Sequence, residues 1–277
     1  QLFSLAADLK IDEQGASGRS GLDGARLFIT PESALDVQQQ LGVDIAMAFD
    51  VFTGRPGERD EAGRTSARTL RWAARTKLRF EETATATTTV FGIMQGGLFE
   101  DLRRENAAQL IEIGFDGYAV GGLSVGEARE QTMATAETSV GLLPKTSPRY
   151  MMGMGTPSDL VELAGWGYDM FDCVMPTRGG RNGLLFTSKG RLSIRNARHA
   201  DSTQPPDEDC PCYCCLNFSR GYLHHLAKRK EMLGASLASY HNLSFYGRLM
   251  RRIRQAITAG RYEEFRGEFL SSQQGDS

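Results

Sequence analysis

The sequence predicts a parallel α/β protein, and three observations support this fold class. Several short runs of residues are almost entirely apolar, as in parallel strands buried on both faces. Longer stretches with helical periodicity separate these runs. The two kinds of segment alternate at the spacing of βαβ units. This pattern fits an open doubly wound sheet as well as a closed eight-stranded barrel.

Strands and helices are expected at definite places along the chain. The predicted parallel strands are residues 42–49, 90–94, 117–120, 150–152 and 170–174, and the predicted helices are residues 65–80, 99–113, 126–138 and 156–165. Thr156 is placed to cap the last of these helices, because Pro157 suits the first helical position. Turn residues also predict hairpins within residues 9–28 and 183–194.

Composition limits the class of protein. The chain has 277 residues, 40% of them hydrophobic, which is enough for one large domain or two small ones and argues against disorder. The net charge of -2 excludes a global basic field, but the 32 lysines and arginines leave room for a local patch that binds RNA. No apolar run approaches the roughly 18 residues of a membrane span. We therefore expect a cytoplasmic protein with no membrane partner.

Polar residues follow three of the predicted strands. They are Asp50, Gln95 and Asp172. Each could simply cap a helix or satisfy a loop, but three at the carboxyl ends of parallel strands suggest an active site. The glycine pairs at 96–97 and 121–122 would let a planar ligand approach the backbone.

Asp172 and two arginines suggest a more specific chemistry. Apolar neighbours bracket Asp172, so we expect its carboxylate to be desolvated and to act as a nucleophile or base. Arg178 and Arg181 lie among glycines and suit phosphate binding, although solvated loop charges are the alternative.

A cluster of cysteines predicts a metal site. Four of the five cysteines lie within residues 210–215, and thiolates this close can converge on one ion in a reducing compartment. All four reaching one ion would be strained, so a distant fourth ligand is expected. The candidates are His224, His225 and His241, and local spacing does not choose among them.

Several motifs together resemble those of the bacterial tRNA-guanine transglycosylases. They are FGIMQGG, GFDGYAVGGLSVGE, FDCVMPTRGGRNG and CxCxxC followed by a His-Asn pair, and the similarity covers residues 1–269. The resemblance implies a (β/α)8 TIM barrel with an inserted zinc-binding subdomain. It also implies exchange of guanine at the wobble position of tRNAs with GUN anticodons for a 7-deazaguanine, either 7-aminomethyl-7-deazaguanine or queuine, in queuosine biosynthesis.

The resemblance assigns roles to individual residues. Asp172 would be the nucleophile that forms a covalent bond to the ribose, and Met152 an apolar platform beneath the base. The base edge would be held by Asp50, Gln95 and the backbone of Gly122 and Leu123, with Glu127 supporting the Leu123 peptide. Structural Zn²⁺ would be bound by Cys210, Cys212, Cys215 and His241, leaving Cys214 as an extra thiol.

Larger-scale features also follow from the resemblance. The barrel would comprise residues 1–200 and 242–277 and the zinc subdomain residues 201–241. The anticodon loop of tRNA would be the partner, with Arg178 and Arg181 near its phosphates, and the protein would be a homodimer.

The chain departs from the family pattern at two places. The family's general acid/base, an Asp in a D-S-G-G-[FY]-Q motif, would precede Gln1, so the sequence looks like a fragment, and we expect little turnover if the protein begins there. Phe52 stands where bacterial members usually have Cys, which suggests an altered base preference, with queuine in place of its aminomethyl precursor.

Two alternatives to this enzyme remain. One is a non-catalytic RNA-binding subunit of a heteromeric transglycosylase, although Asp50, Gln95 and Asp172 are all retained. The other is an archaeal-type enzyme, which carries additional carboxy-terminal RNA-binding domains.

Overall fold

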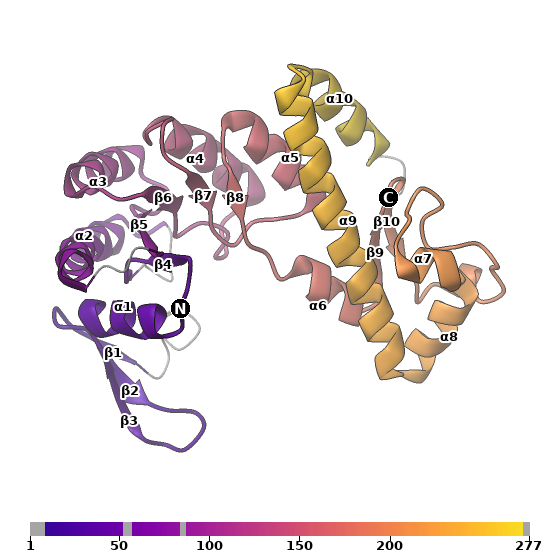
Figure 1. Ribbon diagram of the computed structural model, residues 1–277, viewed down its shortest axis with the longest axis horizontal. Helices are drawn as coiled ribbons and strands as arrows, with labels where there is room; N and C mark the ends of the chain where they lie inside the picture. The colour runs from indigo at the N-terminus through magenta and orange to yellow at the C-terminus, as the bar shows by residue number, and fades with distance from the viewer. Residues whose placement is uncertain (1–8, 52–56, 84–86, 274–277) are drawn as a thin grey trace. The chain divides into compact units, whose positions relative to one another are not determined.

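The computed structural model describes residues 9–51, 57–83 and 87–273 (Figure 1). Contacts divide the chain into two compact units. The first unit is Gln1–Met152 with Gly167–Met170, and the second is Gly153–Trp166 with Phe171–Ser277. The proposed limits of the zinc subdomain, residues 201–241, stay a prediction. No helix in the described part of the chain is long and apolar enough to span a membrane.

The first unit is built on a curled parallel sheet, as the sequence predicts. Its strands are β4 (Ile45–Met47), β5 (Thr89–Met94), β6 (Gly117–Val120), β7 (Arg149–Met151) and β8 (Met170–Phe171), in that order across the sheet. The strands from β4 to β7 pair in parallel. The curvature is that of half a barrel (Figure 1), so the closed barrel is the better of the two predicted architectures.

Helices of the first unit cover the sheet between successive strands. They are α1 (Pro31–Gln40), α2 (Arg59–Thr83), α3 (Glu100–Ile113) and α4 (Arg129–Gly141), and they contact β4, β5, β5 and β6 respectively. Helix α1 was not predicted, although Thr30 and Ser33 form a capping box at its start. Helix α4 begins later than predicted, because Gly126 has a φ of +132° and the Glu127 carboxylate bonds to the preceding loop.

An antiparallel sheet precedes the parallel one. It comprises β1 (Lys10–Ile11), β2 (Ala16–Arg19) and β3 (Arg26–Ile29), and the predicted hairpin in this region is confirmed. The buried indole of Trp72 donates to Glu13 O at 2.9 Å and stacks on Phe49, with 4.9 Å between ring centroids. Because Phe49 directly precedes Asp50, this packing holds the loop after β4.

The first helix of the second unit is α5 (Pro157–Trp166), as predicted. Thr156 caps its start, because the Asp159 N–H donates to Thr156 Oγ1 at 3.2 Å. It continues through α6 (Met175–Arg181), the hairpin of β9 (Leu184–Thr187) and β10 (Gly190–Ser193), the 3₁₀ turn η2 (Ala197–His199) and the helices α7 (Tyr213–Asn217), α8 (Arg220–Arg229), α9 (Met232–Thr258) and α10 (Tyr262–Ser272). Gly180 lets α6 approach α9 closely, because a Cβ there would lie 2.6 Å from Ser239 N.

Candidate active site and metal centre

Asp50 and Gln95 meet at the carboxyl ends of two neighbouring parallel strands. Asp50 follows β4 and Gln95 directly follows β5. Gln95 Nε2 donates to Asp50 Oδ2 at 2.8 Å, and the Gln95 side chain is almost fully buried. The structure therefore brings together two of the residues that the sequence singled out, with their polar groups directed at each other.

Buried polar groups on the helices hold this pair in place. The backbone N–H of Gln95 donates to Asn106 Oδ1 at 3.2 Å, and Asn106 Nδ2 donates to Ser66 Oγ at 2.8 Å. Gly121 leaves room for the amide, because a Cβ there would lie 2.6 Å from Gln95 Nε2. Sequence reasoning missed Asn106 and Ser66, and the available signal was a polar residue on the buried face of a helix.

The loop that carries Asp50 is fastened to α2. The Val51 N–H donates to Thr69 Oγ1 at 3.1 Å, and the Thr69 hydroxyl donates to Val51 O at 2.8 Å. Removal from water raises the pKa of Asp50 to about 6, against the opposing effect of the Gln95 hydrogen bond. The Asp50 carboxyl therefore changes protonation close to neutral pH. Phe52, two residues on, lies outside the described residues.

Glu127 folds back on the loop that follows β6. Its carboxylate accepts from the N–H groups of Ser124 and Val125, at 2.5 and 2.9 Å, and from the Thr132 hydroxyl at 2.7 Å. Partial burial raises the pKa of Glu127, but these hydrogen bonds outweigh it, and the pKa lies below its usual value. The Ser124 N–H faces Glu127, so the Leu123 carbonyl in the same trans peptide points the opposite way.

Two further predicted residues lie at strand ends of the first unit. Gly122 is the second residue after β6, has a φ of +68° and is half-buried. Within the described residues, its N–H donates to no protein acceptor. Met152 directly follows β7, and its half-buried position is fixed by a 3.3 Å hydrogen bond from its N–H to Val120 O.

Asp172 belongs to the second unit and directly follows β8. Its Oδ1 accepts from the Gly153 N–H at 2.8 Å. The expected desolvation of Asp172 is wrong, because the residue is exposed. The apolar neighbours point elsewhere: Phe171 packs into the core of the second unit, and Cys173 lies against Gly155.

Arg178 and Arg181 lie one helical turn apart on α6. Both side chains are exposed, and neither forms an ion pair with a carboxylate among the described residues. Their charges are therefore available to a ligand. The structure brings them onto one face of a helix, where residues three apart are neighbours.

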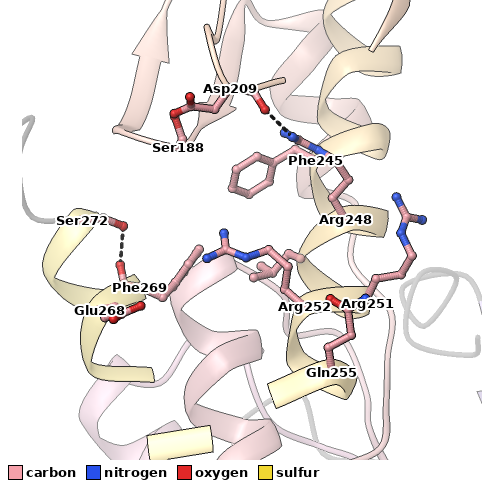
Figure 2. A pocket seen from close by; sticks show the side chains of 11 residues that line it. Ser188, Asp209, Phe245, Arg248, Arg251, Arg252, Gln255, Glu268, Phe269 and Ser272 are labelled. Atoms are coloured by element: carbon pink, nitrogen blue, oxygen red, sulfur yellow. Dashed lines mark hydrogen bonds between the residues drawn. The ribbon is translucent and has the colours of Figure 1, made fainter. Parts of the chain in front are cut away.

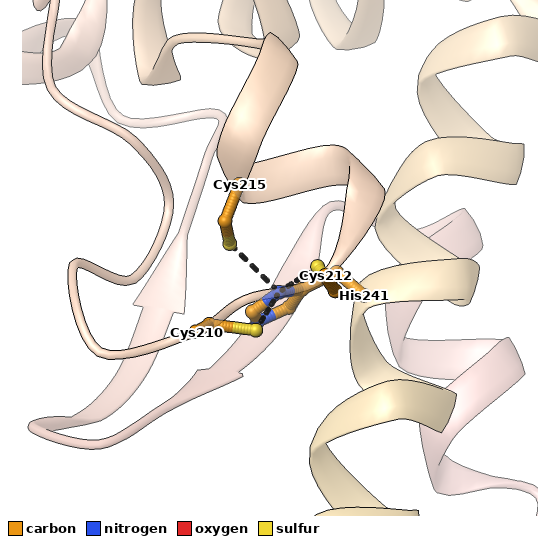
Figure 3. A group of neighbouring side chains, drawn as sticks. All are labelled: Cys210, Cys212, Cys215 and His241. Atoms are coloured by element: carbon orange, nitrogen blue, oxygen red, sulfur yellow. Dashed lines mark hydrogen bonds between the residues drawn. The ribbon is translucent and has the colours of Figure 1, made fainter.

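The metal-ligating side chains of Cys210, Cys212, Cys215 and His241 converge in the second unit (Figure 3). All four are buried, and their donor atoms lie within 4.8 Å of one another. The distances from His241 Nδ1 to the three sulfurs are 3.8, 3.6 and 3.2 Å. Ligands bound to one tetrahedral zinc ion at about 2.0–2.3 Å are roughly 3.5–3.8 Å apart, so this set of donors fits zinc.

The backbone of β9 orients His241 for metal binding. His241 Nε2 lies 2.8 Å from Phe186 O, and because a carbonyl only accepts, Nε2 carries the proton and Nδ1 presents its lone pair to the sulfurs. The neighbouring Asn242 accepts from the Phe186 N–H at 3.0 Å. His224 instead donates to Ile194 O at 2.8 Å, and His225 is exposed, so neither joins the cluster.

Cys214 is fully buried beside the cluster but is not part of it. Burial raises the pKa of Cys214 to about 12, and the adjacent thiols Cys212 and Cys210 contribute to the increase. Position sets Cys214 apart, since it is not among the four residues whose donor atoms lie within 4.8 Å of one another.

A separate pocket of about 620 Å³ lies beside α9 and α10 (Figure 2). Arg248 donates to Asp209 O at 2.8 Å at one side of it, and the guanidinium of Arg252 stacks on Phe265 with 5.1 Å to the ring centroid. This pocket contains none of the residues that the sequence singled out, so it is distinct from the candidate site.

The metal centre makes a testable distinction between two cysteines. Cys214→Ser should retain about one zinc per chain, because Cys214 lies outside the donor set. Cys215→Ser should lose zinc and lower the melting temperature, because three ligands bind the ion more weakly. Elemental analysis of the purified variants measures both. Loss of metal from the Cys214 variant would show that the three cysteine ligands are wrongly assigned.

Comparisons with known proteins agree with this geometry. The sequence profile of the queuine tRNA-ribosyltransferase family matches residues 1–275. The chain is 47% identical over 272 residues to a queuine tRNA-ribosyltransferase of Francisella tularensis subsp. novicida, covering 98% of this chain and 73% of that protein. It is 50% identical over 275 residues to one of Desulfosudis oleivorans, covering 99% of this chain and 72% of that protein. The chain therefore belongs to the queuine tRNA-ribosyltransferase family.

Proposed function

We propose that this protein is a pentosyltransferase, a tRNA-guanine transglycosylase. It exchanges guanine at the wobble position of tRNAs with GUN anticodons for a 7-deazaguanine, in queuosine biosynthesis. The observation that carries the proposal is the Asp50–Gln95 pair beside the unbonded N–H of Gly122. A carboxylate acceptor with amide and backbone donors matches the edge of guanine, which presents N–H donors next to a carbonyl. Family membership supports the same function.

Asp172 is the nucleophile in this proposal. Its carboxylate oxygen bonds to C1′ of the target ribose as the bond from C1′ to guanine breaks, and guanine leaves with that electron pair. The incoming base then bonds to C1′ and releases Asp172. It loses the proton on the bonding nitrogen, which balances the proton that the departed guanine takes up from solvent, and two inversions retain the configuration. The hydrogen bond from the Gly153 N–H to Oδ1 holds the Asp172 carboxylate in position. The target nucleotide must be unstacked to enter the site, and Arg178 and Arg181 are proposed to contact its phosphates.

The loop after β6 supports an aminomethyl base as the incoming substrate. Because Glu127 holds the Ser124 N–H, the Leu123 carbonyl is turned away from Glu127 and can accept from an ammonium group. Met152 would lie beneath the base as an apolar platform. The alternative substrate, queuine, rests on Phe52 and stays a prediction.

The metal centre has a structural part in this proposal. Zn²⁺ would be held by Cys210, Cys212, Cys215 and His241, and four protein ligands leave no position for a reacting water. Free thiols of this kind persist in a reducing compartment, which supports a cytoplasmic location. Residues 201–241 are proposed as the zinc subdomain, inserted between barrel segments 1–200 and 242–277.

An exposed aromatic patch supports the proposed homodimer. The patch consists of Tyr213, Leu216, Phe218, Tyr222 and Tyr240, and the ring of Tyr213 contacts those of Phe218 and Tyr240 with centroids 5.7 and 6.4 Å apart. Leu216 is 72% exposed. Contiguous exposed apolar surface of this kind is typical of protein interfaces. The patch residues lie between Cys210 and His241 in the sequence, in the same segment as the metal ligands, which agrees with a dimer interface near the zinc unit.

A non-catalytic RNA-binding subunit remains the alternative function. It would retain the fold and the metal centre without forming a bond to RNA, so the covalent intermediate separates the two.

Asp172→Asn should abolish the covalent complex with tRNA, because an amide is a far weaker nucleophile than a carboxylate. The full-length protein is incubated with tRNA and a guanine analogue, and the complex that survives denaturation is measured by gel electrophoresis. Asp169→Asn is the matched control, since Asp169 directly precedes β8 and its carboxylate contacts Arg149, through the backbone N–H at 2.8 Å and the guanidinium at 4.0 Å. Failure of the unsubstituted protein to form the complex would favour the non-catalytic subunit.

The affinity for guanine should fall about tenfold between pH 7.5 and pH 5, because a group of pKa about 6 is mostly protonated at pH 5 and no longer accepts from the base. The lowered pKa of Glu127 keeps that residue ionised over most of this range. Asp50→Asn should remove the pH dependence and bind guanine weakly throughout. Calorimetric titration provides the measurement, and an unchanged affinity across this range would contradict the role of Asp50.

Leu216→Asp should convert the proposed dimer into monomers, because a carboxylate would be buried in the aromatic patch. Sedimentation velocity measures the change. Leu22→Asp is the control, since Leu22 is fully exposed in the first unit and lies outside the patch. A monomeric unsubstituted protein would reject the dimer.

A further inference from the structure

Arg103 is a fully buried arginine in the middle of the first unit. It lies on α3, and among the described residues no carboxylate forms an ion pair with it. Its guanidinium is satisfied by backbone carbonyls: Nε donates to Gly97 O at 2.7 Å and Nη2 to Gly121 O at 3.0 Å. The third nitrogen, Nη1, lies 3.8 Å from Met94 Sδ. The side chain therefore joins the loops that follow β5 and β6.

A buried charge without a direct ion pair is destabilising, so its presence needs a physical reason. Removal from water lowers the pKa of Arg103 to about 10, against the opposing electrostatic effects of Tyr168 and Glu127, and the guanidinium stays protonated at neutral pH. A buried methionine or leucine would avoid the desolvation cost but would leave the carbonyls of Gly97 and Gly121 without these donors. The guanidinium therefore acts on the backbone groups that it contacts.

The contact with Gly121 O reaches the candidate base site through one peptide group. The Gly121 carbonyl and the Gly122 N–H belong to the same trans peptide and point in opposite directions. The buried Arg103 guanidinium donates to the Gly121 carbonyl from the interior, so the Gly122 N–H is directed away from the core. A charge-assisted hydrogen bond also draws electron density toward the carbonyl oxygen and makes the N–H a stronger donor. That N–H donates to no protein acceptor among the described residues.

The second contact fixes the neighbouring loop. The Gly97 carbonyl lies two residues after Gln95, and Gly96 between them has a φ of +140°. A Cβ on Gly96 would lie 2.8 Å from Arg103 N, so this loop lies directly against α3. One side chain thus holds the loop that begins with Gln95 and the loop after β6, whose Gly121 lies against the Gln95 amide.

We propose that Arg103 is a positioning residue that makes the site specific for purines with an oxygen at C6, by orienting and polarising the Gly121–Gly122 peptide. This inference rests on the proposed function, because it takes guanine and 7-deazaguanines as the ligands. In this proposal the Gly122 N–H donates to the C6 carbonyl oxygen, which guanine and the 7-deazaguanines share. Adenine carries an amino group at C6, and two donors facing each other are unfavourable.

The test compares two bases that differ only at C6. Guanine and 6-thioguanine share their N–H donors, but sulfur is a much weaker acceptor than oxygen. Equilibrium binding of both bases is measured for the full-length protein and for Arg103→Gln. The expected result is a loss of about 10- to 100-fold in affinity for guanine, as for removal of a charge-assisted hydrogen bond, and about threefold or less for 6-thioguanine.

Two further variants make the outcome decisive. Arg104→Gln is the matched control, because Arg104 is the next residue on α3, is exposed and bonds only to Glu100, so both affinities should be unchanged. Arg103→Lys keeps the charge and most of the volume but lacks the fork that reaches both carbonyls, so its losses should be smaller, and the loss should again be larger for guanine than for 6-thioguanine. If Arg103→Gln does not fold, the comparison of the two bases in Arg103→Lys serves as the test.

Equal losses for the two bases in the variants that fold would overturn the inference, because a merely structural role of Arg103 weakens both alike. Unchanged guanine affinity would overturn it too. No guanine binding by the unsubstituted protein would instead reject the proposed function, and this inference with it.

Discussion

The hydrogen bond from Gln95 to Asp50 joins the ends of two parallel strands, and the surrounding structure is organised to maintain it. This 2.8 Å contact depends on three requirements. The Gln95 backbone must be held in place, Gly121 must lack a side chain that would clash with the Gln95 amide, and the loop after β4 must be fastened to α2. Each requirement is met by a different part of the chain. Asn106 holds the backbone of Gln95, and Thr69 holds that of Val51. The candidate base site is thus held in place by buried polar groups from two helices, α2 and α3.

The metal centre lies in a region that has little other means of stabilisation. The chain from β10 to α8 contains little regular structure and offers few apolar residues to bury. The core in this region is instead formed by the four cysteines with Leu185, Leu223 and their neighbours. Metal ligation would join α7 to α9, and the contacts of His241 and Asn242 with Phe186 join α9 to β9. A zinc ion bound there would stabilise the second unit without taking part in the reaction.

Much of this arrangement could be predicted from sequence. The apolar strands followed from periodicity, but their order across the sheet did not. The strand-end residues followed from their places in the sequence, whereas local spacing left the fourth metal ligand open and only the family resemblance implied His241. Helix α1 was missed because its signal is a cap and not an apolar stripe. The exposure of Asp172 was also missed, since side chains alternate along an extended chain and apolar neighbours need not shield the residue between them. Arg103 gave no signal, because in sequence it is one of two adjacent arginines on an amphipathic helix, and only the fold shows which one is buried.

The two carboxylates beside the candidate base site have opposite pKa shifts, and the cause lies in their hydrogen-bond partners. Asp50 has one side-chain donor, Gln95, which does not compensate for removal from water, so its pKa rises to about 6. Glu127 has donors from Ser124, Val125 and Thr132, which outweigh its burial and lower its pKa. Asp50 thus has acceptor capacity left for a ligand, whereas Glu127 is largely used in holding its own loop. An incoming base with N–H groups supplies the donors that Asp50 lacks, so binding should stabilise the ionised form of Asp50 and leave that of Glu127 unaffected.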